Sequence, residues 1–170
     1  MNFSVSTIAF KNCRPRTLLP SIKRLINSTH SNLELWEKHL YLASDHEILN
    51  KIYSVSVYEN FSQPFFDGLQ SIVDFKKKFI TRNRLLVRVF AGNKSSHLLN
   101  ASERMILFKN IDKYYSRYLK KNMILMFETH QGTFLDTPAS ILEFIKCMNN
   151  PEIKLLLDIH NLLTGSCNSL

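Results

Sequence analysis

The amino-acid sequence predicts an α/β fold built on a parallel sheet. Strand-like and helix-like segments alternate along all 170 residues. Strands separated by helices pair in parallel, because each crossover helix returns the chain to the same end of the sheet. The apolar run at 123–127 is typical of a strand that is buried on both faces. This order of elements fits both an open doubly wound sheet and an incomplete barrel.

The first part of the chain contains two predicted strands. Residues 3–10 alternate in polarity and predict a strand, and apolar residues at helical spacing predict a helix over 16–27. Residues 32–36 predict a short second strand. Ser44 and Glu47 then have the spacing of a capping box, which predicts that a short helix begins there.

Two further strands are predicted in the middle of the chain. Residues 52–58 alternate cleanly, and residues 85–90 form an apolar run. Between them, Ser62 and Pro64 are typical of a helix start, and the apolar spacing continues this helix towards Phe79.

The last part repeats the pattern. A long amphipathic helix over 102–121 precedes the fifth strand at 123–127. The sequence Asp136-Thr137-Pro138 predicts a capped helix start, and that helix ends before Pro151. The sixth strand is predicted at 153–157, and residues 161–170 show no convincing element.

The chain is basic, with 22 Lys and Arg against 14 Asp and Glu and a net charge of +8. The excess gathers at Lys76, Lys77, Lys78, Arg82 and Arg84. Such a cluster is typical of the solvated end of a helix, where cations also suit the macrodipole. A phosphate-binding patch is the alternative. The charge alone does not predict a nucleic-acid partner.

Composition excludes several classes of protein. No segment approaches the roughly 18 uninterrupted apolar residues of a membrane helix, and residues 1–10 lack the pattern of a secretory signal. Three sparse cysteines, Cys13, Cys147 and Cys167, have no metal-finger spacing. We therefore predict a cytoplasmic protein without a membrane partner. The chain is also too short for a complete eight-stranded α/β barrel, which takes about 250 residues.

Polar residues follow the predicted strands at the edge where their carboxyl ends meet. In parallel α/β folds this edge carries the chemistry, and a charge that closes an apolar strand needs a partner, a metal or water. The candidates are Glu34 and Trp36 after the second strand, Arg88 in the fourth, Glu128 and His130 after the fifth, and Asp158 and His160 after the sixth.

Glu128 and Asp158 are the most specific pair of candidate site residues. They follow consecutive strands, which usually lie side by side about 5 Å apart. Their carboxylates could therefore hold one divalent cation, and the alternative is that each pairs with a local Lys or Arg. Arg88 either neutralises a substrate phosphate or forms a structural ion pair with Glu128.

The remaining candidates could contact a substrate. His130 and His160 lie two residues beyond the two carboxylates and are metal ligands, contacts to sugar hydroxyls, or plain loop residues. Glu34 and Trp36 line a sugar pocket, unless the indole belongs to the core. The chain has no nucleotide-binding glycine loop and no G-x-S-x-G elbow. Metal-assisted carbonyl chemistry and plain binding are the classes that remain.

Five segments resemble, in order, the strands of one family. Residues 125–133 (LMFETHQGT), followed by Asp136-Thr137-Pro138, resemble the fifth-strand segment of the xylose isomerase-like TIM-barrel superfamily. Four further segments resemble other strands of this superfamily: 6–10 the first strand, 33–36 the second, 86–92 the fourth and 155–160 the sixth. The superfamily contains sugar-phosphate isomerases and epimerases, inosose dehydratases and the endonuclease IV type of DNA repair enzyme. The resemblance implies a single (β/α) TIM-barrel domain over 1–170.

The resemblance also implies roles for particular residues. Members generally bind a divalent cation through a glutamate on strand five, an aspartate on strand six, a histidine on strand seven and a glutamate on strand eight. Glu128 would then be a metal ligand and the catalytic acid–base residue, Asp158 a metal ligand, and His130 a neighbour of the substrate. The cation would be Mn²⁺, Mg²⁺, Co²⁺ or Zn²⁺. Many members place a histidine three residues after the aspartate, where this chain has Asn161 and carries His160 one residue earlier.

The sequence ends soon after the sixth predicted strand. We therefore expect the last two β/α units to be missing, and with them the strand-seven histidine and the strand-eight glutamate. Two carboxylates and water hold a cation weakly, and proton transfer loses its second partner. Open edges at the first and sixth strands predict self-association into a homo-oligomer.

Three functions compete at this point. The first is a metal-dependent sugar or sugar-phosphate isomerase or epimerase, which moves a proton next to a carbonyl of a small molecule. The second is a truncated, catalytically inactive relative that only binds a ligand or self-associates. The third is a nuclease of the endonuclease IV type, which needs histidines after strands two and three; this chain has Glu59 and Asn60 after strand three, and His39 is loosely placed. Whether the chain is an enzyme by itself is left open.

Overall fold

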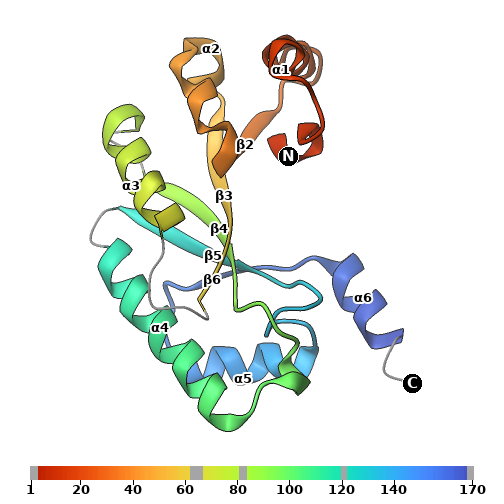
Figure 1. The fold of residues 1–170 in the computed structure, drawn as a ribbon, viewed down its shortest axis with the longest axis vertical. Helices are drawn as coiled ribbons and strands as arrows, with labels where there is room; N and C mark the ends of the chain where they lie inside the picture. The colour runs from red at the N-terminus through yellow and green to blue at the C-terminus, as the bar shows by residue number, and fades with distance from the viewer. Residues whose placement is uncertain (1–3, 62–66, 81–83, 120–121, 168–170) are drawn as a thin grey trace.

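Six parallel strands form one curled sheet in the computed structural model, which describes residues 4–61, 67–80, 84–119 and 122–167 (Figure 1). The strands lie in sequential order, and each neighbouring pair is parallel. A doubly wound sheet would reverse its order at a switch point, so this order confirms the barrel type, here incomplete. The strands are β1 (Ser4–Ser6), β2 (Asn32–Trp36), β3 (Ile52–Asn60), β4 (Leu85–Phe90), β5 (Met123–Glu128) and β6 (Lys154–Leu156).

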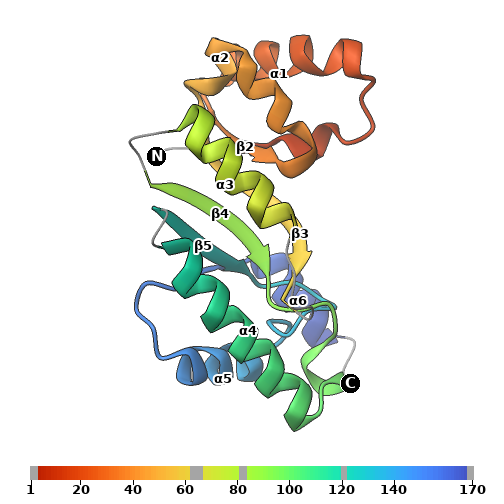
Figure 2. The ribbon, with the colours of Figure 1, turned by 60° about the vertical axis from the view of Figure 1, so that its left-hand side comes forward.

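Helices line the outer side of the curled sheet. In Figure 1 they follow an arc from α1 to α5, and the sheet opens on the side between α1 and α6. Figure 2 shows α3 and α4 lying across the same side of β3, β4 and β5. The α-helices are α1 (Pro15–Thr29), α2 (His46–Leu49), α3 (Asp67–Phe79), α4 (Ala101–Leu119), α5 (Pro138–Met148) and α6 (Ile159–Cys167), and the 3-10 helices are η1 (Thr7–Phe10), η2 (Glu37–Ser44) and η3 (Ser96–Leu98).

The two faces of the sheet differ in chemistry, because side chains alternate along each strand. Odd-numbered residues such as Leu35, Val87 and Leu125 point to the helices and are at most 1% exposed. Even-numbered residues, such as Glu34 and Arg88, point to the inner, concave face. The core therefore lies between the sheet and the helices, and the concave face is left for polar groups.

Two helix starts show how local chemistry sets the boundaries. Thr137 caps α5, its hydroxyl accepting from the Ser140 N–H at 3.1 Å, as the sequence predicts. For α2 the predicted cap is wrong by one residue, since Asp45 rather than Ser44 accepts from the N–H groups of Glu47 and Ile48.

Other boundaries differ from the predictions. The first strand ends at Ser6 and not at residue 10, because the buried Thr7 turns its hydroxyl to accept from the Trp36 N–H at 2.8 Å and η1 follows. A helix, α6, occupies 159–167, although the sequence predicts no element from 161 onwards. The predicted helix start at Ser62 and Pro64 lies outside the described residues. No helix in the described ranges is both long and apolar enough to cross a membrane.

Candidate active site

Arg88 holds two carboxylates together on the concave face. Its Nε donates to Glu34 Oε2 at 3.1 Å and its Nη2 to Glu34 Oε1 at 2.9 Å, a bidentate pairing. Its Nη1 donates to Glu128 Oε2. The three side chains come from β4, β2 and β5, and each is at most 12% exposed. This cluster, named here the Glu34–Arg88–Glu128 triad, braces three strands from inside.

The strand between Glu34 and Arg88 makes this contact possible. In the register of the sheet, β3 places Ser54 beside Glu34, and Ser56 between Trp36 and Arg88. Both serines are buried. Because their side chains are short, the guanidinium of Arg88 can reach across β3 to a strand that is not its neighbour.

The charges of the triad do not cancel. Burial by itself would lower the pKa of Arg88, but the charges of Glu34 and Glu128 outweigh burial, and the pKa of Arg88 is raised. Arg88 is therefore always cationic, and the two carboxylates leave one negative charge in excess. A buried excess charge of this kind is stable only beside further polar groups, water or a cation.

A row of aromatic side chains borders the triad. The Trp36 ring lies 5.1 Å from that of His39 and 6.3 Å from that of Tyr58. The row continues from Tyr58 to Phe90 at 5.2 Å and from Phe90 to His130 at 5.2 Å. The carboxyl ends of β2, β3, β4 and β5 therefore share one aromatic wall, in which the ring pairs are edge-to-face except for the tilted pair of Tyr58 and Phe90.

Burial changes the ionisation of two members of this wall. Burial lowers the pKa of His39. A hydrogen bond to the backbone of Thr7 acts in the opposite direction but has the smaller effect. Burial also raises the pKa of Tyr58. Both side chains are consequently neutral near pH 7, and they can exchange hydrogen bonds with a neutral ligand.

Three buried polar atoms near the triad have no hydrogen-bond partner among the described residues. They are Trp36 Nε1, His39 Nδ1 and Ser56 Oγ. Buried polar atoms almost always have a partner in a folded protein. Since all three belong to residues on or beside the concave face, they are suited to bind water or the hydroxyl groups of a ligand.

Asp158 is tied to the end of β5 through Thr129. The Asp158 N–H donates to Thr129 Oγ1 at 2.8 Å, and the Thr129 N–H donates to the Leu156 carbonyl at 3.0 Å. The carboxylate itself accepts from Asn161, from the backbone N–H at 3.2 Å and from Nδ2 at 2.8 Å. Asp158 therefore caps the start of α6, two residues after the end of β6, the strand that pairs with β5 of Glu128.

The predicted site residues divide into three groups. The first is the triad, which shows that Arg88 pairs with Glu128, one of the two roles left open for it. Trp36 lies within the aromatic wall, between His39 and Tyr58, and His130 lies at one end of it. Asp158 lies two residues beyond the end of β6, and His160 has an exposed side chain in the first turn of α6.

Sequence reasoning missed His39, Tyr58 and the two serines of β3. The serines had a readable signal, since small residues at alternate positions of an otherwise apolar strand leave space on one face of a sheet. His39 had no such signal, because it lies on η2, between the predicted strand at 32–36 and the predicted short helix that follows.

The donor set for a divalent cation is small. Glu128 and Asp158 have the oxygen ligands that Mg²⁺ or Mn²⁺ prefers, but one oxygen of Glu128 is engaged by Arg88 and Asp158 is engaged by Asn161. The described residues contain no group of three or more His, Cys, Asp or Glu side chains that could hold a metal. The described part of the chain does not by itself form a complete metal site.

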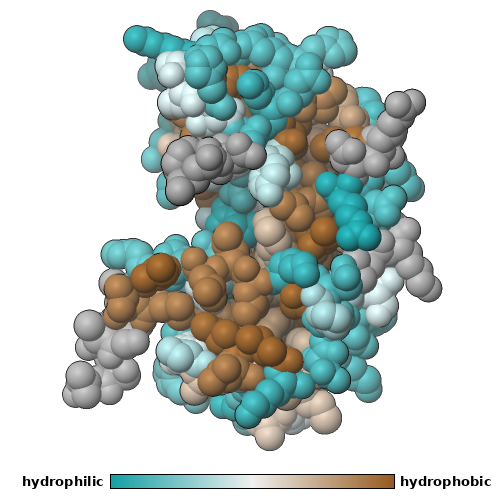
Figure 3. All heavy atoms as spheres, turned by 180° about the vertical axis from the view of Figure 1, so that it is seen from behind, coloured by the Kyte–Doolittle hydropathy of each residue, from teal (hydrophilic) through white to brown (hydrophobic). Residues whose placement is uncertain are grey.

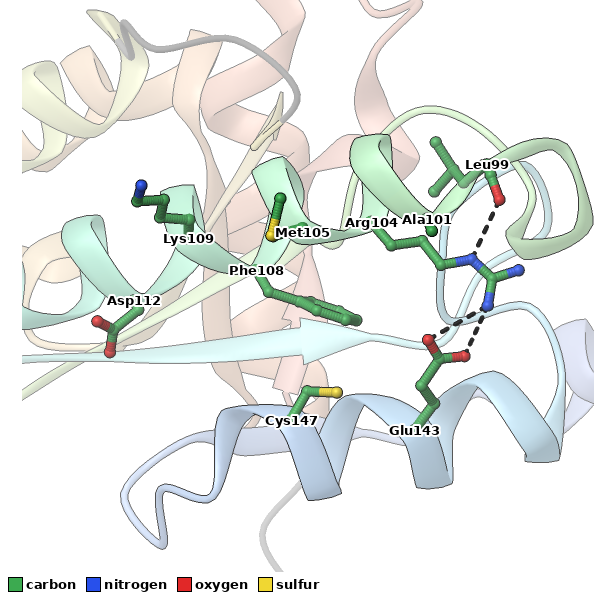
Figure 4. Close-up of a pocket in the computed structure, with 9 residues that line it drawn as sticks. All are labelled: Leu99, Ala101, Arg104, Met105, Phe108, Lys109, Asp112, Glu143 and Cys147. Atoms are coloured by element: carbon green, nitrogen blue, oxygen red, sulfur yellow. Dashed lines mark hydrogen bonds and ion pairs between the residues drawn. The ribbon is translucent and has the colours of Figure 1, made fainter.

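A separate cavity of about 820 Å³ lies on the helical side of the protein, between α4 and α5 (Figure 4). Figure 4 shows the Arg104–Glu143 ion pair at one end, joined at 2.9 Å, and Cys147 and Phe108 beside it. The Arg104–Glu143 pair is already satisfied within the protein, and the cavity lies on the helical side of the sheet, away from the concave face that carries the triad.

The chain is similar to two known proteins. No family model matches the chain. A curated relative, 3-dehydroshikimate dehydratase of Bacillus anthracis, is 25% identical over 179 residues, which span 93% of this chain and 61% of that protein. The crystal structure of the probable 3-DHS dehydratase AsbF, involved in petrobactin synthesis in Bacillus anthracis, is similar with a TM-score of 0.76 and 22% identity, over 98% of this chain and 66% of that one.

The chain thus spans about two thirds of the length of these relatives. The TM-score of 0.76 shows that the arrangement of strands and helices in this chain is similar to that in the solved structure. The structural similarity confirms the fold that the resemblance implies, an incomplete (β/α) barrel.

Proposed function

We propose that the chain supplies the amino-terminal part of a site that removes a proton from a carbon next to a carbonyl, in a small hydroxylated molecule of the 3-dehydroshikimate type. The observation that carries the proposal is the buried carboxylate of Glu128, held at the end of β5 on the concave face by Arg88. A carboxylate in this position is suited to act as a general base.

Dehydration of a hydroxy ketone begins with this proton transfer. A base takes the proton from the carbon next to the carbonyl, and the electron pair of the broken C–H bond forms the enolate. The enolate then expels the hydroxyl group of the next carbon, which leaves as water after taking up a proton. Isomerisation and epimerisation share the first step, so the predicted isomerase or epimerase activity differs only in the fate of the enolate. The names of the relatives favour dehydration.

The other residues of the concave face suit binding rather than proton transfer. Trp36 Nε1, His39 Nδ1 and Ser56 Oγ are free to bind substrate hydroxyls. Arg88 positions Glu128 and keeps its carboxylate oriented. We retain His130 as a substrate contact at the end of the aromatic wall, and His160 as a predicted contact at the start of α6.

The proposal includes a divalent cation, for which this chain supplies only some of the ligands. Glu128 and Asp158 would contribute two oxygen ligands, and further ligands would come from residues outside the described part of the chain. When bound, such a cation polarises a carbonyl oxygen and stabilises the enolate.

Proton exchange tests the proposal without requiring the complete dehydration. The purified chain is incubated in D₂O with 3-dehydroshikimate and Mn²⁺, the cation is then removed by chelation, and deuterium at the carbon next to the ketone is measured by NMR. We expect exchange above the buffer rate in the native chain. In Glu128→Gln this rate should fall about 100-fold or more, or to the buffer rate, because the general base is lost.

Glu143→Gln is the matched control, since Glu143 is paired with Arg104 on the outer helices and should leave the rate unchanged. Equal exchange in the native chain and in Glu128→Gln would show that Glu128 is not the base. Exchange at the buffer rate in the native chain would favour the inactive, ligand-binding relative.

A further inference from the structure

We propose that the surface where α3 ends and where β3 and β4 begin, named here the basic pole, binds the phosphate backbone and the bases of a single-stranded nucleic acid. The residues that carry the proposal are Lys77, Lys78, Arg84 and Tyr53. The basic pole lies at the opposite end of the sheet from the triad, since β5 rises about 17 Å from its start to Glu128. The proposal goes beyond the proposed chemistry, and either can fail without the other.

Two basic segments lead to the starts of β4 and β5. Residues 76–84 carry five Lys and Arg, residues 113–121 carry four, and neither segment contains Asp or Glu. The starts of the two strands are neighbours, because the Leu85 N–H donates to the Asn122 carbonyl at 3.1 Å and Leu85 pairs with Met123. Figure 2 shows them side by side. The sheet therefore brings the two basic segments to the same pole of the molecule.

The positive charge at the end of α3 exceeds what the helix itself requires. Lys76 is 7% exposed and donates to the Ile80 carbonyl at 3.1 Å, so this lysine already serves the end of the helix. The carboxyl end of a helix is equivalent to about half a negative charge. Lys77 and Lys78 are exposed in addition, and Lys78 Nζ lies 4.9 Å from the centroid of the Phe79 ring. Two further cations thus face solvent at this helix end.

Arg84 adds a third cation, which is only weakly engaged. Its Nη1 lies 3.9 Å from Glu152 Oε2, and the two side chains are 67% and 51% exposed. Exposed ion pairs contribute little to stability, so a phosphate oxygen can replace this carboxylate. The guanidinium group binds phosphate through two parallel N–H groups. Arg84 is therefore suited to hold a phosphate of a nucleic-acid backbone.

A shift in strand register presents an aromatic side chain at the same pole. Consecutive residues of β2 pair with Ile52 and Ser54, so Tyr53 is an extra residue in β3. Such an insertion re-aims a side chain, and Tyr53 is 54% exposed. On the other side of β3, Ser54 pairs with Leu86, which places Tyr53 near Arg84 along the sheet. Cations beside an exposed aromatic ring are typical of single-strand binding, because unpaired bases stack on the ring.

The surroundings favour a nucleic acid over a membrane. A basic surface that binds a bilayer also inserts exposed apolar side chains, but among the described residues of β3, α3 and β4 the exposed large apolar side chains are Tyr53 and Tyr58. Figure 3, seen from behind, shows hydrophobic atoms gathered towards the helix at the lower left, and hydrophilic atoms along the opposite edge. Leu157, Ile159 and Leu163 of that apolar region are 60%, 68% and 64% exposed. Positive charge and apolar surface are therefore separated.

Fluorescence anisotropy with a labelled oligothymidylate of about 20 nucleotides tests the proposal on the purified chain. We expect saturable binding with a dissociation constant of about 1–100 µM near physiological salt. The dissociation constant should rise about 50-fold between about 50 and 200 mM NaCl, because each neutralised phosphate releases a counterion.

A triple variant locates the phosphate contacts. Lys77→Gln with Lys78→Gln and Arg84→Gln should weaken binding about tenfold or more at low salt and flatten the salt dependence, since three phosphate contacts are lost. The matched control removes the same charge from exposed residues of α1, α4 and α5: Arg16→Gln, Lys109→Gln and Lys146→Gln. It should bind within about threefold of the native chain, because these charges are distant from the oligonucleotide and screened by salt.

A tyrosine pair tests the stacking. Tyr53→Ala should weaken binding of the single strand about tenfold and leave binding of a duplex of the same length nearly unchanged, because a duplex offers no unpaired base. Tyr41→Ala is the control, since Tyr41 is similarly exposed, at 57%, but lies on η2 beyond the carboxyl end of β2. Circular dichroism checks that all variants remain folded.

Four results would overturn the proposal: no saturable binding by the native chain at low salt, equal weakening by the two triple variants, equal binding by Tyr53→Ala and Tyr41→Ala, or tighter binding per phosphate to phosphatidylserine vesicles than to the oligonucleotide. The last result would assign the basic pole to a membrane surface. Oligonucleotide binding without proton exchange on 3-dehydroshikimate would support the basic pole and contradict the proposed function only.

Discussion

The two faces of the sheet differ in what they bury, although their side chains come from adjacent residues of the same strands. The outer face buries apolar side chains and the concave face buries charged ones. On β5, Leu125 and Phe127 point to the helices and are at most 1% exposed, whereas Glu128 points to the concave face and is held by Arg88. The outer face is stabilised by removing apolar surface from water. The concave face buries charges, which contribute stability only while they are paired. Stability and chemistry are therefore separated by the alternation of the strand.

Removing the central cation should have the largest effect. In Arg88→Met the carboxylates of Glu34 and Glu128 lose their shared partner while both stay buried. We expect the free energy of unfolding to fall by about 3–5 kcal/mol at pH 7, measured by urea denaturation.

The triple variant Glu34→Gln, Arg88→Met and Glu128→Gln is the control, because it removes all three charges together. It should recover a large part of the loss. If Arg88→Met were as stable as the native chain, the triad would be solvated, and the contrast between the two faces would not hold.

Neighbouring truncations on β5 compare the faces directly. Leu125→Ala removes a side chain that is 1% exposed under the helices, and should cost about 2–5 kcal/mol through lost burial and the cavity left behind. Met126→Ala removes a half-buried side chain from the concave face, and should cost about 1 kcal/mol. Urea denaturation measures both. Equal losses would mean that the concave face is packed like a core.

The smallest expected effect is a dependence on pH. Burial lowers the pKa of His39 below its ordinary value of 6.5, so the unfolded chain binds a proton at a pH where the folded chain does not. The stability due to neutral His39 is complete above pH 6.5 and is lost as the pH falls towards the lower, folded pKa. The urea midpoint should therefore decrease between about pH 7.5 and 5.5.

His39→Gln should flatten this decrease, while the same substitution at the exposed His97 should leave it unchanged. An unaltered slope in His39→Gln would assign the pH dependence to other groups.

Much of the fold could be predicted because period and capping are local properties. The strands at 32–36, 85–90 and 123–128, and the Thr137 cap, depend on residues that are close in sequence. The first strand ends early for a non-local reason, the bond from the Trp36 N–H to Thr7. The helix at 159–167 begins at Asp158, whose carboxylate has the chemistry of a cap as well as that of a metal ligand, and the sequence alone does not separate the two.

The site could be predicted only in part. The register of a parallel sheet brings strand ends together, so Glu128 and Arg88 are expected near one another, and an ion pair between them is one of the two roles that the sequence allows. The pairing of Arg88 with Glu34 could not be predicted, because it skips a strand. It depends on the curvature of the sheet and on the short side chains of Ser54 and Ser56, and neither effect is visible in the pattern around Arg88.

The hydroxyl of Thr129 has a consequence for how the site behaves in time. It accepts from the Asp158 N–H at the junction where β6 and α6 join the rest of the chain. Because β6 is three residues long and the first turn of α6 is exposed, this end should open locally at a free-energy cost well below that of global unfolding. Glu34, Arg88 and Glu128 would stay fixed while Asp158 swings away. The triad side of the candidate site should therefore be the more rigid and the Asp158 side the more readily opened, and ligand entry on the Asp158 side would require no movement of the triad.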